Sequence, residues 1–201
     1  MDRLTAEKIS QALSHHDSRQ VDRFSGLFLR DEIKNARKAA VILPMLEVDG
    51  RWHVLLTRRS DDLVEHRGQV AFPGGAMEPE DEDLQWTALR EMQEEVGVQP
   101  SDVTVLGTLG ELHVITGYLV RLFVGKIPWP YELEINHDEV ANAFIIPLDW
   151  LADPDHRTIE HRTYQNREIP VIFFDDYQGE QLWGASAEMT LALLSALDGI
   201  L

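Results

Sequence analysis

The sequence contains no cysteine among its 201 residues. This absence excludes disulfide bonds, thiolate metal sites and thiol nucleophiles. No apolar run approaches the ~20 residues of a membrane-spanning helix, and the first residues, MDRLTAEKISQ, lack the apolar stretch of a signal peptide. From these absences we expect a cytoplasmic protein with no membrane partner.

Basic residues are scarce. The chain has 18 lysines and arginines against 35 aspartates and glutamates, which gives a formal net charge of −17. Proteins that bind nucleic acids draw most of their affinity from neutralised phosphates, so a chain this acidic is a poor candidate for that class. Acidic residues are usually exposed surface residues that keep a protein hydrated. They indicate a functional site only where several carboxylates cluster more closely than a hydrated surface requires.

Apolar patterning divides the chain into an N-terminal extension and one larger domain. Helical spacing of apolar residues and a possible cap at Thr5 predict a helix over residues 4–13, before a polar, irregular segment. We therefore expect residues 1–36 to form a helix and an extension that pack on the core. Residues 37–201 are expected to form the domain itself, which is long enough to bury a full core.

Strand and helix patterns alternate from residue 38 onward. Asp49-Gly50 favours a hairpin turn between the strands AAVILPMLEV and RWHVLLTRR. Pro44 lacks an N–H group, so we expect the first strand to lie at a sheet edge or to contain a bulge. The other expected elements are a short strand and a Pro-Gly-Gly turn within 68–82, a helix over 83–96 ended by Gly97, strands at 103–109, 118–125 and 143–146, a short helix at 149–152, a hairpin at 158–174 and a helix at 186–197. This order predicts an α/β (α+β) fold, an α/β/α sandwich with a mixed β-sheet between helices.

The helix expected over residues 83–96 concentrates acidic side chains. At about 100° per residue, Glu94 lies about 60° to one side of Glu91 and Glu95 about 40° to the other, so the three share one arc. Arg90 precedes Glu94 by four residues and can pair with it. The neighbouring arc is apolar and is expected to be buried; it contains Ala88, Leu89, Met92 and Val96.

Two interpretations of these carboxylates stay open from the helix alone. Like charges three and four residues apart destabilise a helix, and this segment has no lysine to dilute them. Grouped carboxylates suit a hard divalent cation such as Mg²⁺, whereas the alternative is a solvated acidic face. Gly74-Gly75, upstream of the helix, lets the backbone turn sharply and approach a ligand closely. That context favours a cradle for phosphate and metal.

The segment FPGG (Phe72 to Gly75) followed by REMQEEVGV (Arg90 to Val98) resembles the Nudix box, the loop–helix motif of hydrolases that act on nucleoside diphosphates linked to another group. Counted forward from Gly75, the acidic residue of the box is Asp81. Counted back from Arg90, it is Glu82, and the glycine position falls on Ala76. A loop that is longer by one residue explains both counts.

A longer match resembles the coenzyme A pyrophosphatase branch of this family. It consists of LLTRRSDDLVEHRGQVAFPGG (Leu55 to Gly75), a lengthened box with Glu78-Pro79-Glu80-Asp81, and LWGASA (Leu182 to Ala187). The chain departs from the branch at Val64, where an arginine is usual. The resemblance covers about residues 37–197. It implies a metal-dependent enzyme that cleaves the diphosphate bond of coenzyme A or a derivative into 3′,5′-ADP and 4′-phosphopantetheine or its acyl form.

The resemblance also implies roles for individual residues. Mg²⁺ or Mn²⁺ would be held by the box glutamates and a backbone carbonyl, Arg90 would orient the glutamates, and Glu139 would be the general base, with Glu111 or a box glutamate as the alternative. The residues implied in catalysis are Glu91, Glu94, Arg90 and Glu139, and those implied in metal binding are Glu91, Glu94, Glu95 and Gly75.

Substrate phosphates need cationic donors, and several candidates lie near the motif. These candidates are Arg58, Arg59, Arg67 and His66, together with the backbone of Gly74. Each charged side chain could equally be a solvated charge at a strand end or in a loop. The partner expected is a small-molecule nucleotide, and the chain is expected to be a monomer or a homodimer.

Two other classes stay open. One is a Nudix enzyme of different specificity, acting on ADP-ribose, a dinucleotide or a nucleoside triphosphate. The other is a non-catalytic Nudix-like module that binds nucleotides. Such modules typically lose the box glutamates, all of which this chain retains.

Overall fold

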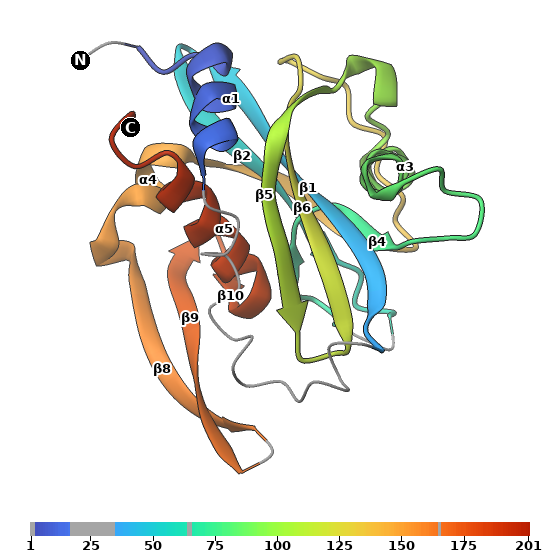
Figure 1. Ribbon diagram of the computed structural model, residues 1–201, viewed down its shortest axis with the longest axis vertical. Coiled ribbons are helices and arrows are strands. Elements are labelled where there is room, and N and C mark those ends of the chain that lie inside the picture. Colours follow the sequence, from blue (N-terminus) through green and yellow to red (C-terminus); the bar gives the residue numbers. More distant parts are fainter. Residues whose placement is uncertain (1–2, 17–34, 64–65, 165) are drawn as a thin grey trace.

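A seven-stranded mixed sheet forms the centre of the protein in the computed structural model, which describes residues 3–16, 35–63, 66–164 and 166–201 (Figure 1). The strands are β1 (Arg37–Val48), β2 (Arg51–Arg59), β3 (Val70–Ala71), β4 (Gly74–Ala76), β5 (Thr104–Val114), β6 (Tyr118–Lys126) and β7 (Val140–Pro147). Their order is β3-β2-β1-β6-β5, with β4 paired to β1 and β7 paired to β2. β1 and β6 are parallel and the other pairs are antiparallel, so the predicted mixed sheet is confirmed.

Helices cover both faces of this sheet (Figure 1). α1 (Ala6–His15) and α5 (Gly184–Ala196) pack on one face, where Ile9 and Leu193 belong to the larger apolar core. α3 (Leu84–Val96) packs on the other face through a separate cluster that includes Ala88 and Met92. The α/β/α sandwich expected from the sequence is therefore confirmed. None of the described helices is long and apolar enough to cross a membrane.

A second, smaller sheet has the strand order β10-β9-β8. The hairpin expected at 158–174 is β8 (Arg157–Tyr164) and β9 (Arg167–Tyr177), whereas β10 (Glu180–Trp183) was not expected. This sheet lies beside α5 in Figure 1, and the tip of the hairpin projects from the body. The remaining short elements are α4 (Leu148–Ala152) and the 3₁₀ turns Pro100–Asp102 and Pro154–His156.

Two local expectations are wrong. β1 is an interior strand, with β6 along one side and β4 and β2 along the other. The N–H of Ile42 bonds to Pro73 O on that second side; N–H groups two residues apart point the same way, so position 44 also faces it. There it falls between the β4 pairs, which end at Val41, and the β2 pairs, which begin at Met45, so Pro44 interrupts neither ladder. The second correction concerns Gly74 and Gly75, which pair with β1 as strand β4 instead of forming a turn.

The N-terminal helix is present as expected. Thr5 caps α1 by accepting a hydrogen bond from the Lys8 N–H at 3.3 Å, and Ile9 and Leu13 are buried. Most of the irregular segment predicted after this helix, and Val64, lie outside the described residues. The division into an extension (1–36) and a domain (37–201) stays a prediction.

Candidate active site

The sequence of α3 fixes which of its faces carries the carboxylates. Asp83 caps the helix by accepting a hydrogen bond from the Trp86 N–H at 2.8 Å, and Gly97, with φ of 76°, ends it. Met92 and Val96 are fully buried against the sheet. This apolar face is the one that the spacing predicted, and the glutamates project beside it.

The three glutamates differ strongly in exposure. The side chain of Glu95 is 3% exposed and that of Glu91 is 13% exposed, whereas that of Glu94 is 52% exposed. Burial raises the pKa of Glu95 to about 8; the Arg59 charge opposes this shift, and the charges of Glu91 and Glu139 add to it. Burial also raises the pKa of Glu91. Both shifts therefore come first from the loss of hydration around buried carboxyl groups, and the charges of the neighbouring glutamates add to them.

Arg90 connects the helix to the loop before it through Asp81. Arg90 Nε donates to Asp81 Oδ1 at 2.9 Å and a second guanidinium nitrogen donates to Oδ2 at 3.0 Å, which makes a two-point pair. The same guanidinium lies 3.0 Å from Glu91 Oε1 and 2.9 Å from Glu94 Oε2. The structure thus confirms the pairing of Arg90 with Glu94 that the spacing predicted, and it adds a contact with Glu91.

Asp81 is a site residue that the sequence analysis counted but did not select. Its side chain is 1% exposed. The Arg90 guanidinium, with the Glu78 N–H and the Thr87 hydroxyl, holds its pKa well below the usual range, although burial acts in the opposite direction. Glu82, by contrast, is exposed. Of the two counts along the box, the one that runs forward from Gly75 therefore identifies the acidic residue correctly. The additional residue of the lengthened loop lies between Asp81 and Arg90.

The glycine pair of β4 lies directly against the carboxylates. A Cβ at Gly75 would lie 2.4 Å from Glu91 Oε1, and a Cβ at Gly74 would lie 2.4 Å from the carbonyl oxygen of Ala40. The backbone of Gly74 also acts on the Glu95 carboxyl group and lowers its pKa slightly against the larger effect of burial. A side chain at Gly74 would push β4 away from the backbone of β1, and one at Gly75 would displace the carboxylate of Glu91 from its position.

The two candidates for the general base lie in different places. Glu139 is near enough to Glu91 and Glu95 for its charge to raise the pKa of both. Its loop is anchored to α3, since the Asn136 N–H donates to Glu95 O at 3.0 Å and the Asn136 side chain contacts Glu139 Oε1 at 3.4 Å. Glu111 instead lies on β5, 3.1 Å from Arg121 across the strand pair.

The arginines proposed to bind substrate phosphates also lie in different places. Arg59 lies 3.9 Å from Glu95 Oε1, and its buried Nε has no hydrogen-bond partner among the described residues. Arg58 is already paired, at 3.1 Å from Asp61 and 3.5 Å from Glu180. Arg67 is exposed in the loop before β3. Of the three arginines, the structure brings only Arg59 to the carboxylates.

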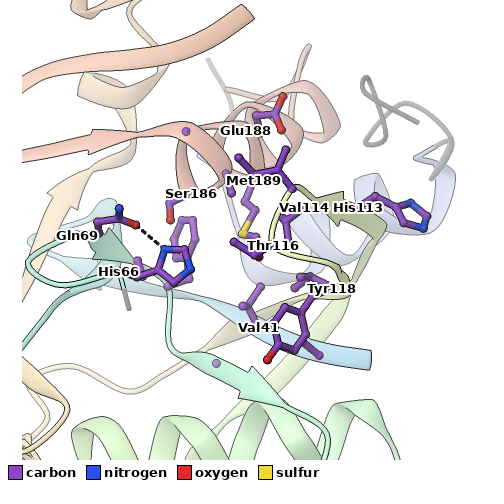
Figure 2. Close-up of a pocket in the computed structure, with 18 of the residues that line it drawn as sticks. Val41, His66, Gln69, His113, Val114, Thr116, Tyr118, Ser186, Glu188 and Met189 are labelled. Atoms are coloured by element: carbon purple, nitrogen blue, oxygen red, sulfur yellow. Dashed lines mark hydrogen bonds between the residues drawn. The ribbon is translucent and has the colours of Figure 1, made fainter. Parts of the chain in front are cut away.

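A pocket of about 700 Å³ opens on the other side of β4. It lies between the sheet and the segment formed by β9 and α5, and most of its lining is apolar. Figure 2 shows Ser186 and Met189 of α5 on one side and Val41 and Tyr118 of the sheet on another, with His66 bonded to Gln69 at its edge (2.9 Å). Further lining residues include Arg59, Gly74, Gly75, Tyr164, Ile169 and Trp183. The glycine pair and Arg59 therefore border both the pocket and the glutamates.

The carboxylates of the box glutamates are suitable ligands for a divalent cation, although their side chains do not yet converge on one point. Within the described parts of the chain, no three acidic or histidine side chains converge as in a ready-made metal site. Glu95 Oε2 is nevertheless buried without a hydrogen-bond partner among those residues, and Glu91 approaches the backbone of Gly75 without an intervening Cβ. Carboxylate oxygens are the ligands that hard cations prefer, and Glu95 Oε2 is one that still lacks a donor.

Comparison with known proteins agrees with this geometry. A profile of the NUDIX domain matches residues 36–167, which is most of the chain. The chain belongs to the Nudix family. Curated relatives named as uncharacterized Nudix hydrolases NudL are 41% identical over 156 residues in Photorhabdus laumondii, covering 76% of this chain and 81% of the relative, and 39% identical over 163 residues in Pectobacterium atrosepticum, covering 77% and 80%. The chain is thus a Nudix hydrolase.

The fold is shared with solved Nudix structures. A Nudix hydrolase from M. smegmatis, RenU, superimposes with a TM-score of 0.53 at 19% identity, over 83% of this chain and 89% of that one. A MutT/nudix family protein from Enterococcus faecalis gives a TM-score of 0.51 at 13% identity, over 98% and 75%. At these identities the likeness concerns the architecture.

Proposed function

We propose that this Nudix hydrolase cleaves the diphosphate bond of coenzyme A or a derivative, with Mg²⁺ or Mn²⁺ as cofactor. The observation that carries the proposal is the position of β4, whose glycines separate the buried glutamates from the apolar pocket. A diphosphate lying along Gly74 and Gly75 would have its phosphorus atoms beside Glu91 and Glu95. One arm of the substrate would then extend into the pocket.

The apolar lining favours coenzyme A over other nucleoside diphosphate conjugates. Coenzyme A carries a pantetheine arm of amide and alkyl groups, whereas ADP-ribose and dinucleotides carry a second sugar with polar hydroxyls. Burying an amide or a hydroxyl without a partner costs about 1–3 kcal/mol each, so the arm with more alkyl carbon for each polar group suits the apolar lining better. The 3′-phosphate of coenzyme A needs a cation, and we assign Arg59 or Arg67 to it, because Arg58 already pairs with two carboxylates.

The residues of the site suit hydrolysis by a positioned water. A divalent cation held by Glu91, Glu94, Glu95 and the carbonyl of Gly75 would polarise the diphosphate and lower the pKa of a bound water. Arg90 keeps Glu91 and Glu94 oriented through its contacts at 3.0 Å and 2.9 Å. Glu139 would accept the proton of the attacking water.

Glu139→Gln should lower turnover by roughly 10²-fold and change the acidic limb of the pH–rate profile, because a neutral amide cannot accept the proton. The measurement is kcat/KM against pH for the variant and the wild type. Glu111→Gln serves as the control and should retain the wild-type profile, since Glu111 is paired with Arg121. An unchanged profile for Glu139→Gln would transfer the role to Glu111 or to a box glutamate.

The substrate assignment is tested by kcat/KM for coenzyme A, dephospho-coenzyme A, ADP-ribose and a dinucleotide, with and without Mg²⁺ or Mn²⁺. We expect metal-dependent release of 3′,5′-ADP and a preference for coenzyme A over its dephospho form of about tenfold, equal to about 1.4 kcal/mol in the transition state. Equal rates for these two would show that the 3′-phosphate is not recognised. Faster hydrolysis of ADP-ribose would reject coenzyme A as the substrate and leave the family assignment intact.

The cytoplasmic location, the absence of nucleic-acid partners and the choice between monomer and homodimer remain predictions from the sequence.

A further inference from the structure

Strand β8 is a long strand with an open edge. It pairs with β9 over all eight residues from Arg157 to Tyr164 without a shift in register, and it forms one end of the three-stranded sheet. Seven of its eight residues are exposed. Figure 1 shows the hairpin projecting from the body, with no described element along the outer side of β8.

The protein protects the neighbouring strand better than it protects β8. β10 covers β9 from Phe173 to Tyr177, and Pro170 lies in the stretch of β9 that β10 does not reach, where it removes one backbone donor. β8 contains no proline or bulge, and its charged side chains, Arg157, Glu160 and Arg162, are of both signs, so they exclude a partner strand only where like charges meet. Ile159 on this strand is 61% exposed, the highest exposed fraction among the large apolar side chains of the described residues. An edge of this kind is a template for another strand.

We propose that β8 pairs with β8 of a second copy of this chain, in antiparallel orientation about a two-fold axis. The pairing would join the two small sheets into one six-stranded sheet. The argument for a second copy is charge complementarity. A two-fold axis must pass through a residue pair. Axes at residues 160 and 161 pair seven of the eight residues of β8, whereas axes at 159 and 162 pair only five.

These registers differ in the charges that they place opposite one another. An axis at Glu160 sets this carboxylate against its own copy, and an axis at Arg162 sets two guanidinium groups against each other. Like charges directly opposite one another destabilise a strand pair. The axis at His161 instead places Glu160 of each copy opposite Arg162 of the other. Within one copy these two side chains already pair at 2.6 Å, but they are 50% and 60% exposed, so each can also meet the opposite charge of the second copy.

The same register uses the other face of the strand. Ile159 would lie opposite Thr163 of the second copy, which covers part of the exposed isoleucine, and β-branched pairs of this kind stabilise strand pairing. The interface is also connected to the pocket, because Tyr164, Ile169 and Ile172 of this hairpin line it. Pairing would therefore hold one wall of the pocket in place.

The test is sedimentation velocity on the full chain from about 1 to about 100 µM, the range in which small interfaces of this type associate. Wild type should shift from monomer to dimer within this range. Glu160→Arg alone and Arg162→Glu alone should weaken the dimer by at least tenfold, since each places like charges opposite one another. The double substitution Glu160→Arg/Arg162→Glu exchanges the two charges and should restore the dimer.

Mixing the two single variants supplies a second, independent readout. The copy with two arginines and the copy with two glutamates are complementary in this register, so an equimolar mixture should form a heterodimer while each variant alone stays monomeric. Circular dichroism of each variant controls for folding. A monomeric wild type, or a dimer indifferent to these charge changes, would overturn the proposal. Neither result bears on the substrate.

Discussion

Glu95→Gln is expected to lower turnover by at least about 100-fold at saturating Mg²⁺ or Mn²⁺, because the loss of one carboxylate ligand loosens the cation that offsets the developing charge. The same result is expected for Glu91→Gln. Steady-state kcat with the preferred substrate, titrated against metal concentration, is the measurement. Turnover near that of the wild type in either variant would remove that residue from the proposed metal set.

The same substitution should stabilise the protein when metal is withheld. In the folded, metal-free chain burial raises the pKa of Glu95 to about 8, from an ordinary value of 4.5. The folded state therefore binds the proton more tightly than the unfolded state, and stability falls as pH rises between about 4.5 and about 8. Replacing Glu95 with glutamine removes this penalty, which is about 2–4 kcal/mol at pH 8.

Thermal melting in excess EDTA at pH 5 and pH 8 measures this difference. Wild type should lose stability between the two values, and Glu95→Gln should lose much less. Glu94→Gln is the matched control from the same helix, since its side chain is half exposed and should leave the pH dependence in place. If Glu95→Gln melted at the wild-type temperature at pH 8, the buried charge of Glu95 would not be what destabilises the metal-free protein.

Asp81→Asn should destabilise the protein by about 2–4 kcal/mol and also reduce activity. Breaking a buried ion pair typically costs 3–5 kcal/mol, because the remaining charge is left uncompensated. The figure is smaller here because Arg90 keeps its contacts with Glu91 and Glu94. Freed from Asp81, the guanidinium would hold these glutamates less well. Urea unfolding at neutral pH gives the stability, and kcat gives the second effect.

The adjacent Glu82→Gln is a matched control for this substitution. Glu82 is exposed, and a surface change of this kind normally alters stability by no more than about 0.5 kcal/mol. The stabilising effect of Asp81 depends on its ionised form, since its pKa is held low. It is therefore present above about pH 4 and lost as the pH falls further. If both variants unfolded at the same urea concentration, the anchoring role of Asp81 would be wrong.

The sequence determined the features that depend on neighbours along the chain. The caps of α3 at Asp83 and Gly97, its buried face and the hairpin at Asp49-Gly50 follow from local hydrogen bonding and from the periods of helix and strand. The Nudix box and its candidate glutamates could be predicted for the same reason, because most of that motif lies within one loop and one helix.

Only the tertiary structure decided what depends on segments far apart in the sequence. Pro44 looked like an edge residue because the sequence does not show that two different strands share one side of β1. The choice between Asp81 and Glu82 needed the position of Arg90, and the choice between Arg58 and Arg59 needed Glu180 and Glu95. Glutamates that share one helical arc differ in burial, because the segments packed against α3 differ along its length. The charges and pKa values of these glutamates therefore depend on packing, which cannot be predicted from residues that are neighbours in the sequence.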